Sequence, residues 1–256
     1  MTVQSRIKAV IFDLDDTLIS AYRRPDLAWR DVCQAFKHEL GELAPDQAAS
    51  ALSDAGQAYW SDPVSHALGR ADPLGARRVI ATAAFVALER DGNCVPSPDI
   101  AERLADAFSL RRDEDMRLEV GALALLADLH KAGYRLALLT NGDGQLQRAK
   151  IERFDLASRF HHVQIEGEVG IGKPDPGAFK RVFAALGVEA AEACVVGDNL
   201  EWDIRPDKAL GCHTIRYAPE AGEPVEPCSG DADDVVQTLA TVWTHLPGSR
   251  VAPNGR

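Results

Sequence analysis

The chain has 256 residues, of which 46% are hydrophobic and 26% charged, and its formal net charge is -11. This composition is ordinary for a globular protein with one large domain, or one domain carrying a sizeable insertion. The acidic balance argues against nucleic acid and anionic membranes as partners, because binding to phosphate backbones relies on clustered Lys and Arg. No apolar run approaches the length needed to span a bilayer. We therefore expect no nucleic-acid partner and no membrane partner.

The N-terminal residues enter an apolar run almost at once, which leaves no room for a signal peptide. The five cysteines are widely spaced and odd in number, and they form neither a Cys-x-x-Cys pair nor a zinc-type cluster with histidine. Such cysteines are typical of buried thiols in a reducing compartment, so we predict a cytoplasmic protein. Either a monomer or a homodimer is compatible with the sequence.

Short apolar runs rich in Val, Ile and Leu predict strands that are buried on both faces of a parallel sheet. These runs lie at 7–12, 134–139, 193–196 and 213–217, with a weaker one at 163–165. Helices are predicted at 121–132, 143–154, 176–186 and about 202–210, and three of them stop before a glycine. The alternation of strand and helix predicts an α/β fold with a doubly wound, Rossmann-like parallel sheet.

Residues 19–117 interrupt this alternation. They contain no convincing strand, are rich in alanine with helical spacing, and are divided by clusters of proline and glycine. We predict an inserted α-helical cap domain over 19–117, placed at the carboxyl ends of the strands, and a core domain formed by 1–18 and 118–246. Residues 231–246 are predicted to form a closing helix and 247–256 a disordered tail.

Side chains suited to phosphate chemistry gather at the predicted strand ends and in one nearby loop. They are Asp13, Asp15 and Thr17; Thr140 and Asn141; Lys173; and Asp198 and Asp203. In a parallel sheet all these ends lie on one edge, so the groups should converge. Carboxylates of Asp13 and Asp198 would bind a hard divalent cation, for which we expect Mg²⁺. Thr140, backbone N–H groups near Asn141, and Lys173 would hold phosphate oxygens, while one carboxylate attacks phosphorus and a second moves a proton.

The segments Asp13-Leu-Asp15-Asp16-Thr17, Thr140-Asn141-Gly142, Lys173-Pro174, and Gly197-Asp198 followed by Asp203 resemble, in order and spacing, the four motifs of the haloacid dehalogenase (HAD) superfamily. The helical insert resembles the C1 cap of its first subclass. The resemblance implies that Asp13 is the nucleophile and that Asp15 is the general acid/base, whose backbone carbonyl also binds Mg²⁺. It further implies that Thr140 and Lys173 bind phosphate, that Asp198 binds the metal, and that Asp203 supports the metal through its waters or orients Lys173. Thr17 is a supporting residue, and Asp16 is a turn residue without a catalytic role.

Asp15 distinguishes the branches of this superfamily. The dehalogenase pattern carries a tyrosine at that position, and phosphomutases usually continue with Gly-Val where this chain has Asp16-Thr17. We therefore predict a Mg²⁺-dependent phosphatase that hydrolyses a small phosphomonoester, a sugar phosphate or nucleotide, through an aspartyl-phosphate. A 2-haloacid dehalogenase, a phosphomutase and a non-catalytic phospho-accepting signalling domain are the alternatives. Residues 140–151 look like the matching stretch of N-acylneuraminate-9-phosphatases and pyrimidine nucleotidases, but no motif in the cap names a substrate.

Overall fold

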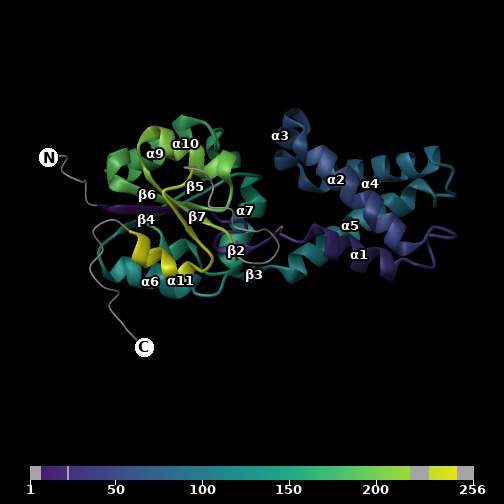
Figure 1. Ribbon diagram of the computed structural model, residues 1–256, viewed down its shortest axis with the longest axis horizontal. Coiled ribbons are helices and arrows are strands. Elements are labelled where there is room, and N and C mark those ends of the chain that lie inside the picture. Colours follow the sequence, from purple (N-terminus) through teal and green to yellow (C-terminus); the bar gives the residue numbers. More distant parts are fainter. Residues whose placement is uncertain (1–6, 22, 220–230, 247–256) are drawn as a thin grey trace. The chain divides into compact units, whose positions relative to one another are not determined.

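The computed structural model describes residues 7–21, 23–219 and 231–246 (Figure 1). The chain divides into two compact units. The first contains the described residues up to Ser20 and from Arg117 onward, and the second is Ala21–Met116. In the described parts of the chain, no helix is both long enough and apolar enough to cross a membrane.

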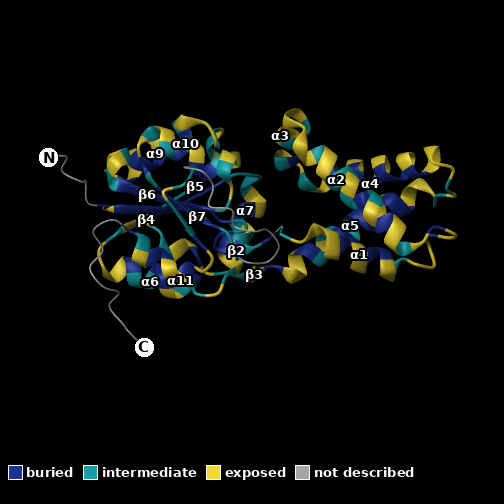
Figure 2. Cartoon of the chain, in the orientation of Figure 1, coloured by how far each residue is buried: buried dark blue, intermediate teal, exposed yellow. Residues whose placement is uncertain are grey.

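A six-stranded sheet forms the centre of the first unit, in the order β5-β4-β1-β6-β7-β8. Its strands are β1 (Ala9–Phe12), β4 (Arg135–Thr140), β5 (His162–Ile165), β6 (Ala193–Gly197), β7 (His213–Tyr217) and β8 (Asp234–Val236). Every neighbouring pair is parallel. All residues of β1 and β6 are buried, as expected for apolar strands covered on both faces (Figure 2). The predicted α/β parallel sheet is thus confirmed.

Helices cover both faces of this sheet. They are α6 (Ala122–Lys131), α7 (Gly144–Arg153), α8 (Glu166–Val169), α9 (Pro176–Leu186), α10 (Arg205–Leu210) and α11 (Leu239–Val242), with short turns η1 (Ala157–Arg159), η2 (Ala190–Glu192), η3 (Leu200–Ile204) and η4 (Trp243–His245). Phe179 and Val182 of α9 pack on the sheet face that carries Ile11. Figure 1 shows α9 and α10 on this side and α6 and α11 on the other.

The prediction of one closing helix over 231–246 is wrong. In its place β8 pairs in parallel with β7, and only the short α11 and η4 follow. The acidic residues before β8 do not begin a helix, because Asp233 Oδ2 instead accepts hydrogen bonds from the backbone N–H (2.9 Å) and the hydroxyl (3.0 Å) of Thr214 on β7. Pairing with the exposed edge of β7 therefore outweighs the local helical pattern. The predicted tail, 247–256, lies outside the described residues.

The second unit consists of α1 (Pro25–Ala35), α2 (Pro45–Ser61), α3 (Pro63–Ala71), α4 (Pro73–Arg90) and α5 (Pro98–Asp115). Each of these helices begins with proline, whose missing N–H costs nothing at the first helical position. Trp29 stacks on Phe108 with ring centroids 3.8 Å apart, inside an apolar core that also contains the fully buried Leu52 and Leu104. The predicted helical insertion is confirmed.

The expectation that 19–117 contains no strand needs one correction. Two-residue strands, β2 (Ile19–Ser20) and β3 (Arg117–Leu118), pair antiparallel at the two ends of the insertion. Strands this short carry no readable periodicity in the sequence. Their pairing brings the segment that leads into the helical insertion next to the segment that leads out of it.

Candidate active site

The end of β1 places the first group of acidic residues. The backbone N–H of Asp13 donates to the carbonyl of Val196 on β6 at 3.0 Å, which extends the ladder one residue beyond the strand. Leu14 and Leu18 are fully buried and anchor the turn that follows. Asp16 lies in this turn with φ of 62°, a left-handed conformation that aspartate tolerates better than most residues. The turn thereby keeps Asp13 in the sheet edge.

Lys173 lies between two carboxylates in the interior. Its Nζ is 2.5 Å from Asp13 Oδ1 and 2.6 Å from Asp203 Oδ1. The lysine is 5% exposed, Asp13 8% and Asp203 2%, so water screens these charges little. Burial alone would lower the pKa of Lys173, but the two carboxylates outweigh it and raise that pKa. The lysine is therefore a permanent cation beside Asp13.

The carboxylates still outnumber the cation. Oxygen atoms of Asp13, Asp198 and Asp203 all lie within 4.8 Å of one another. Burial raises the pKa of Asp13 to about 7, against the attraction of Lys173 and with the help of repulsion from Asp203. Burial, then repulsion from Asp13 and Asp203, raises the pKa of Asp198 well above its usual value. Three crowded carboxylates form a hard oxygen donor set that fits a divalent cation such as Mg²⁺.

Asn141 fixes the loop that carries Lys173. Its side-chain amide donates to the carbonyl of Lys173 at 2.7 Å and accepts from the N–H of Lys173 at 2.8 Å. Both polar groups of this side chain are thus used inside the protein. A Cβ on Gly172 would lie 2.6 Å from Asn141 Oδ1 and 2.5 Å from the carboxyl carbon of Glu166, so this close approach requires glycine.

Asp198 directly follows β6, and Asp203 lies in η3, the turn that comes next. The side chain of Asn199 caps this turn by accepting from the N–H groups of Glu201 at 2.9 Å and Trp202 at 3.1 Å. Asp203 Oδ2 accepts from the N–H of Asn199 at 3.1 Å, which turns Asp203 back toward Lys173. Predicted as one helix from about 202, this segment in fact begins as a π-helical turn at Leu200.

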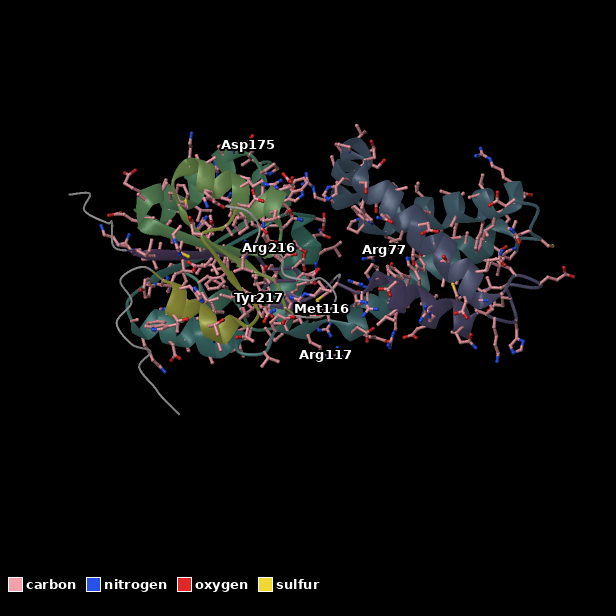
Figure 3. The ribbon with its side chains drawn as sticks, viewed as in Figure 1. Arg77, Met116, Arg117, Asp175, Arg216 and Tyr217 are labelled. Carbon is pink, nitrogen blue, oxygen red and sulfur yellow. The ribbon has the colours of Figure 1, made fainter. Side chains whose placement is uncertain are left out.

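Two further side chains approach Asp198. Thr17 Oγ1 lies 3.5 Å from Asp198 Oδ1. Arg216 of β7, labelled in Figure 3, donates from Nε to the backbone carbonyl of Asp198 at 3.2 Å. Sequence reasoning missed Arg216, because no motif marks it and only the parallel pairing of β6 with β7 brings it there.

Sequence reasoning also missed two residues of α7. Gln147 donates from Nε2 to Thr140 Oγ1 at 2.6 Å and to Asp15 Oδ2 at 3.0 Å. Lys150 Nζ lies 2.8 Å and 2.9 Å from the two carboxylate oxygens of Asp15. The available signal was their spacing of three positions, which places both side chains on one helical face directly after the second motif.

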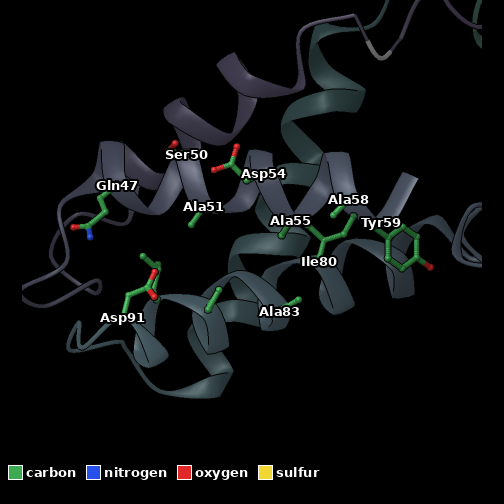
Figure 4. Close-up of a pocket in the computed structure, with 12 residues that line it drawn as sticks. Gln47, Ser50, Ala51, Asp54, Ala55, Ala58, Tyr59, Ile80, Ala83 and Asp91 are labelled. Carbon is green, nitrogen blue, oxygen red and sulfur yellow. The ribbon is translucent and has the colours of Figure 1, made fainter. Parts of the chain in front are cut away.

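The helical unit has a groove of its own, between α2 and α4 (Figure 4). Alanines dominate its lining, and Asp54 and Asp91 are its acidic residues. No Lys, Arg or His belongs to the described residues that line it. This groove therefore does not fit a phosphate group, and the chemistry-bearing residues are those of the sheet unit.

Comparison with known proteins shows the family to which the chain belongs. A family model described as haloacid dehalogenase-like hydrolase matches residues 7–211. The chain belongs to this family. The resemblance carried by the four motifs is thus confirmed, and so is its expectation of a hydrolase.

Relatives of this HAD chain include named phosphatases. The phosphoserine phosphatase of Thermus thermophilus is 35% identical over 230 residues, which cover 82% of this chain and 88% of that protein. The N-acylneuraminate-9-phosphatase of Rattus norvegicus is 31% identical over 235 residues, covering 85% of each. The crystal structure of the Bacillus subtilis HAD-hydrolase YfnB, bound to magnesium, matches with a TM-score of 0.67 over 95% of this chain and 100% of that one. Its sequence identity is 21%, so this likeness shows the fold alone.

Proposed function

We propose that this HAD-family hydrolase is a phosphatase acting on small phosphomonoesters, with Asp13 as its nucleophile. The observation that carries the proposal is the buried contact of Asp13 with Lys173, with a second carboxylate, Asp15, two residues along the same strand end. A nucleophilic carboxylate needs a nearby cation, because it would otherwise be repelled by the phosphate it attacks.

The reaction would proceed in two steps. First, a carboxylate oxygen of Asp13 forms a bond to phosphorus while the ester oxygen departs and takes a proton from Asp15. Second, water attacks the phosphorus of the aspartyl-phosphate and gives its proton to Asp15, which releases inorganic phosphate and restores Asp13. Lys173 keeps its proton throughout and offsets negative charge on the phosphoryl oxygens.

Thr140 is the proposed neutral ligand of the phosphate. Thr140 is the last residue of β4 and is 1% exposed, and Gln147 donates to its hydroxyl oxygen. Its O–H makes a long bond of 3.4 Å to the carbonyl of Asn141, and we propose that it donates to phosphate instead when substrate binds. Because the Asn141 side chain is committed to Lys173, only backbone N–H groups near Asn141 are proposed to contact phosphate. Their alignment would follow from the loop that Asn141 holds.

Mg²⁺ is the proposed cofactor, held by the carboxylates of Asp13 and Asp198 and by the backbone carbonyl of Asp15. When bound, it would shield the negative charge of nucleophile and phosphate from one another. The closeness of the Asp13 and Asp198 carboxylate oxygens and the raised pKa of Asp198 support the two carboxylates of this donor set. Since Asp203 lies 2.6 Å from Lys173, the geometry favours a role for Asp203 in orienting the lysine over a role as a direct ligand.

A small organic phosphate is the proposed substrate class. The named activities of the relatives support it: phosphoserine, glyceraldehyde 3-phosphate and N-acylneuraminate 9-phosphate are all phosphomonoesters of small molecules. A panel of sugar phosphates, nucleotides and phosphorylated hydroxy acids would define the preference within this class.

The test measures phosphate release from p-nitrophenyl phosphate by the purified chain, in Mg²⁺ and in EDTA. We expect activity that needs Mg²⁺ and falls by at least ~10³-fold in Asp13→Asn. Asp99→Asn, the same change at an exposed position of α5, is the matched control and should keep full activity. Unchanged turnover in EDTA or in Asp13→Asn would contradict the proposal. Chloride release from chloroacetate without phosphatase activity would support a dehalogenase instead.

A further inference from the structure

The carboxylate of Asp15 is held by side chains of α7. Lys150 contacts both of its oxygens, at 2.8 and 2.9 Å, and Gln147 contacts Oδ2 at 3.0 Å. The side chain of Lys150 is 11% exposed and that of Asp15 is 20% exposed, so this pair is largely removed from water. An ion pair at the surface is weak because water and salt screen it, whereas a pair with this little exposure is screened much less.

Gln147 also links Asp15 to the proposed phosphate ligand. Its Nε2 lies 2.6 Å from Thr140 Oγ1, and the residue is 3% exposed. The N-terminus of α7 is itself fixed, because Asp143 Oδ1 accepts from the N–H groups of Gln145 and Leu146 at 3.0 Å. The side-chain amide of Gln147, on a capped helix, therefore holds Asp15 at a fixed distance from Thr140.

We propose that Lys150 and Gln147 are positioning residues that fix the orientation of the Asp15 carboxylate and so control proton transfer from Asp15 to the ester oxygen, and from the attacking water to Asp15. The inference rests on the proposed function, because it assigns a role within that reaction. Neither residue is proposed to touch the substrate or to exchange a proton; both act through N–H bonds that they donate to Asp15.

The hydrogen-bonding capacity of a carboxylate explains how this works. Two carboxylate oxygens have about four lone-pair positions. Three N–H bonds from Lys150 and Gln147 occupy three of them, which leaves one position where the transferred proton can be carried. A general acid must bring this proton within hydrogen-bond reach of the leaving oxygen. An unrestrained Asp15 would rotate about its side-chain torsions and spend less time in that orientation.

The dependence of rate on the leaving group distinguishes this role from a structural one. A nitrophenolate leaves readily without a proton, whereas an alkoxide needs one in the transition state. Loss of the positioning residue should therefore slow alkyl phosphates selectively. A general loss of folding or of phosphate binding would slow all esters by the same factor.

The experiment measures kcat/KM with p-nitrophenyl, phenyl and benzyl phosphate, which share a ring but differ in leaving group. We expect Lys150→Met to lose ~10- to 100-fold on benzyl phosphate, part of the usual contribution of a general acid, and less than ~3-fold on p-nitrophenyl phosphate. Lys150→Arg, which keeps the charge, should recover part of the loss. Lys180→Met, at an exposed lysine of α9, is the control and should change none of the three rates.

A second arm asks whether Lys150 acts through Asp15. In an Asp15→Asn background, Lys150→Met should cause no further loss, because the group it positions is already absent. Gln147→Leu serves as the second variant; because Gln147 also bonds to Thr140, this variant should slow all three esters and slow benzyl phosphate the most. Equal loss on all three esters, a faster rate on benzyl phosphate, or an additive loss in Asp15→Asn would overturn the inference. So would a wild-type enzyme that hydrolyses p-nitrophenyl phosphate but not benzyl phosphate, whereas no turnover of any ester would overturn the proposed function instead.

Discussion

The two units of this protein both have apolar cores, but they differ in the polar and charged side chains that they bury. Of the ten polar or charged side chains that are buried among the described residues, nine belong to the sheet unit and only Arg112 belongs to the helical unit. The sheet unit buries carboxylates, a lysine and hydroxyls at its strand ends. The helical unit buries alanines, leucines and stacked aromatic rings. Electrostatic interactions among buried charges therefore matter in the sheet unit, whereas apolar packing dominates in the helical unit.

This difference has a physical consequence. A buried charge is stable only while its partners are in place, so one substitution at the strand ends should affect stability and activity together. An apolar core responds to lost volume instead, with a cost that depends on the cavity left behind. The following predictions test this contrast, from the largest effect to the smallest.

Lys173→Met should be the most damaging change. It leaves the carboxylates of Asp13 and Asp203 buried without their cation, which we expect to lower the free energy of unfolding by about 3–5 kcal/mol and to abolish phosphatase activity. The measurement is denaturant unfolding in EDTA, so that no metal replaces the lost charge. Lys180→Met should stay within about 0.5 kcal/mol of the wild type. A Lys173→Met protein as stable as the wild type would show that the ion pairs are not needed for folding.

Leu104→Ala tests the helical unit in the same way. Leu104 is fully buried on α5, so its truncation should cost about 2–5 kcal/mol. Hydrogen exchange should lose protection within Ala21–Met116 and keep it in β1 and β4. Leu110→Ala is a matched control on the same helix, because Leu110 is 67% exposed and its truncation leaves no cavity. Equal loss of protection in β1 would contradict the view that this core is separate.

Asp207 gives an effect that depends on pH and amounts to at most about 1.4 kcal/mol for each pH unit. It is fully buried on α10, its Oδ1 accepts a weak bond from Cys212 Sγ at 3.8 Å, and its Oδ2 has no hydrogen-bond partner. Burial, and then repulsion from Asp203, raises the pKa of Asp207 well above its usual value. The carboxyl group of Asp207 therefore binds its proton more tightly in the folded protein than in the unfolded chain.

It follows that Asp207 lowers stability as the pH rises above the pKa of the unfolded chain, by up to about 1.4 kcal/mol per pH unit, until its folded pKa is reached. Asp207→Asn removes this dependence. The difference in unfolding free energy between variant and wild type should move in favour of the variant as the pH rises from 4 to 8. A flat difference for Asp207→Asn would show that the carboxyl is already ionised in the folded protein.

Most of the sheet was predictable from particular residues. The runs around Val10, Leu138 and Val195 contain almost no polar side chain, which is the signature of a strand buried on both faces. The helix before Gly187 was predicted with its observed bounds, because proline begins it and a left-handed glycine ends it. The convergence of Asp13, Thr140 and Asp198 also followed, since parallel strands end on one edge.

The errors share a physical cause. Residues 231–246 have helical spacing, but the edge of β7 offers hydrogen bonds that a local pattern cannot reveal. The strands β2 and β3 exist only because two segments almost one hundred positions apart meet. In both places a distant partner decided the local conformation.

The amino-acid sequence by itself determined five of the six strands of the large sheet, the helical insertion and the set of residues expected at the sheet edge, because burial and chain stiffness act on neighbouring residues. Only the tertiary structure decided which side chain meets which. It placed Lys150 on Asp15 across 135 positions and Asn141 on Lys173, and it turned Asp203 toward the same lysine. Such contacts form only when two elements pack at a particular distance and rotation. No single segment of the sequence specifies that packing.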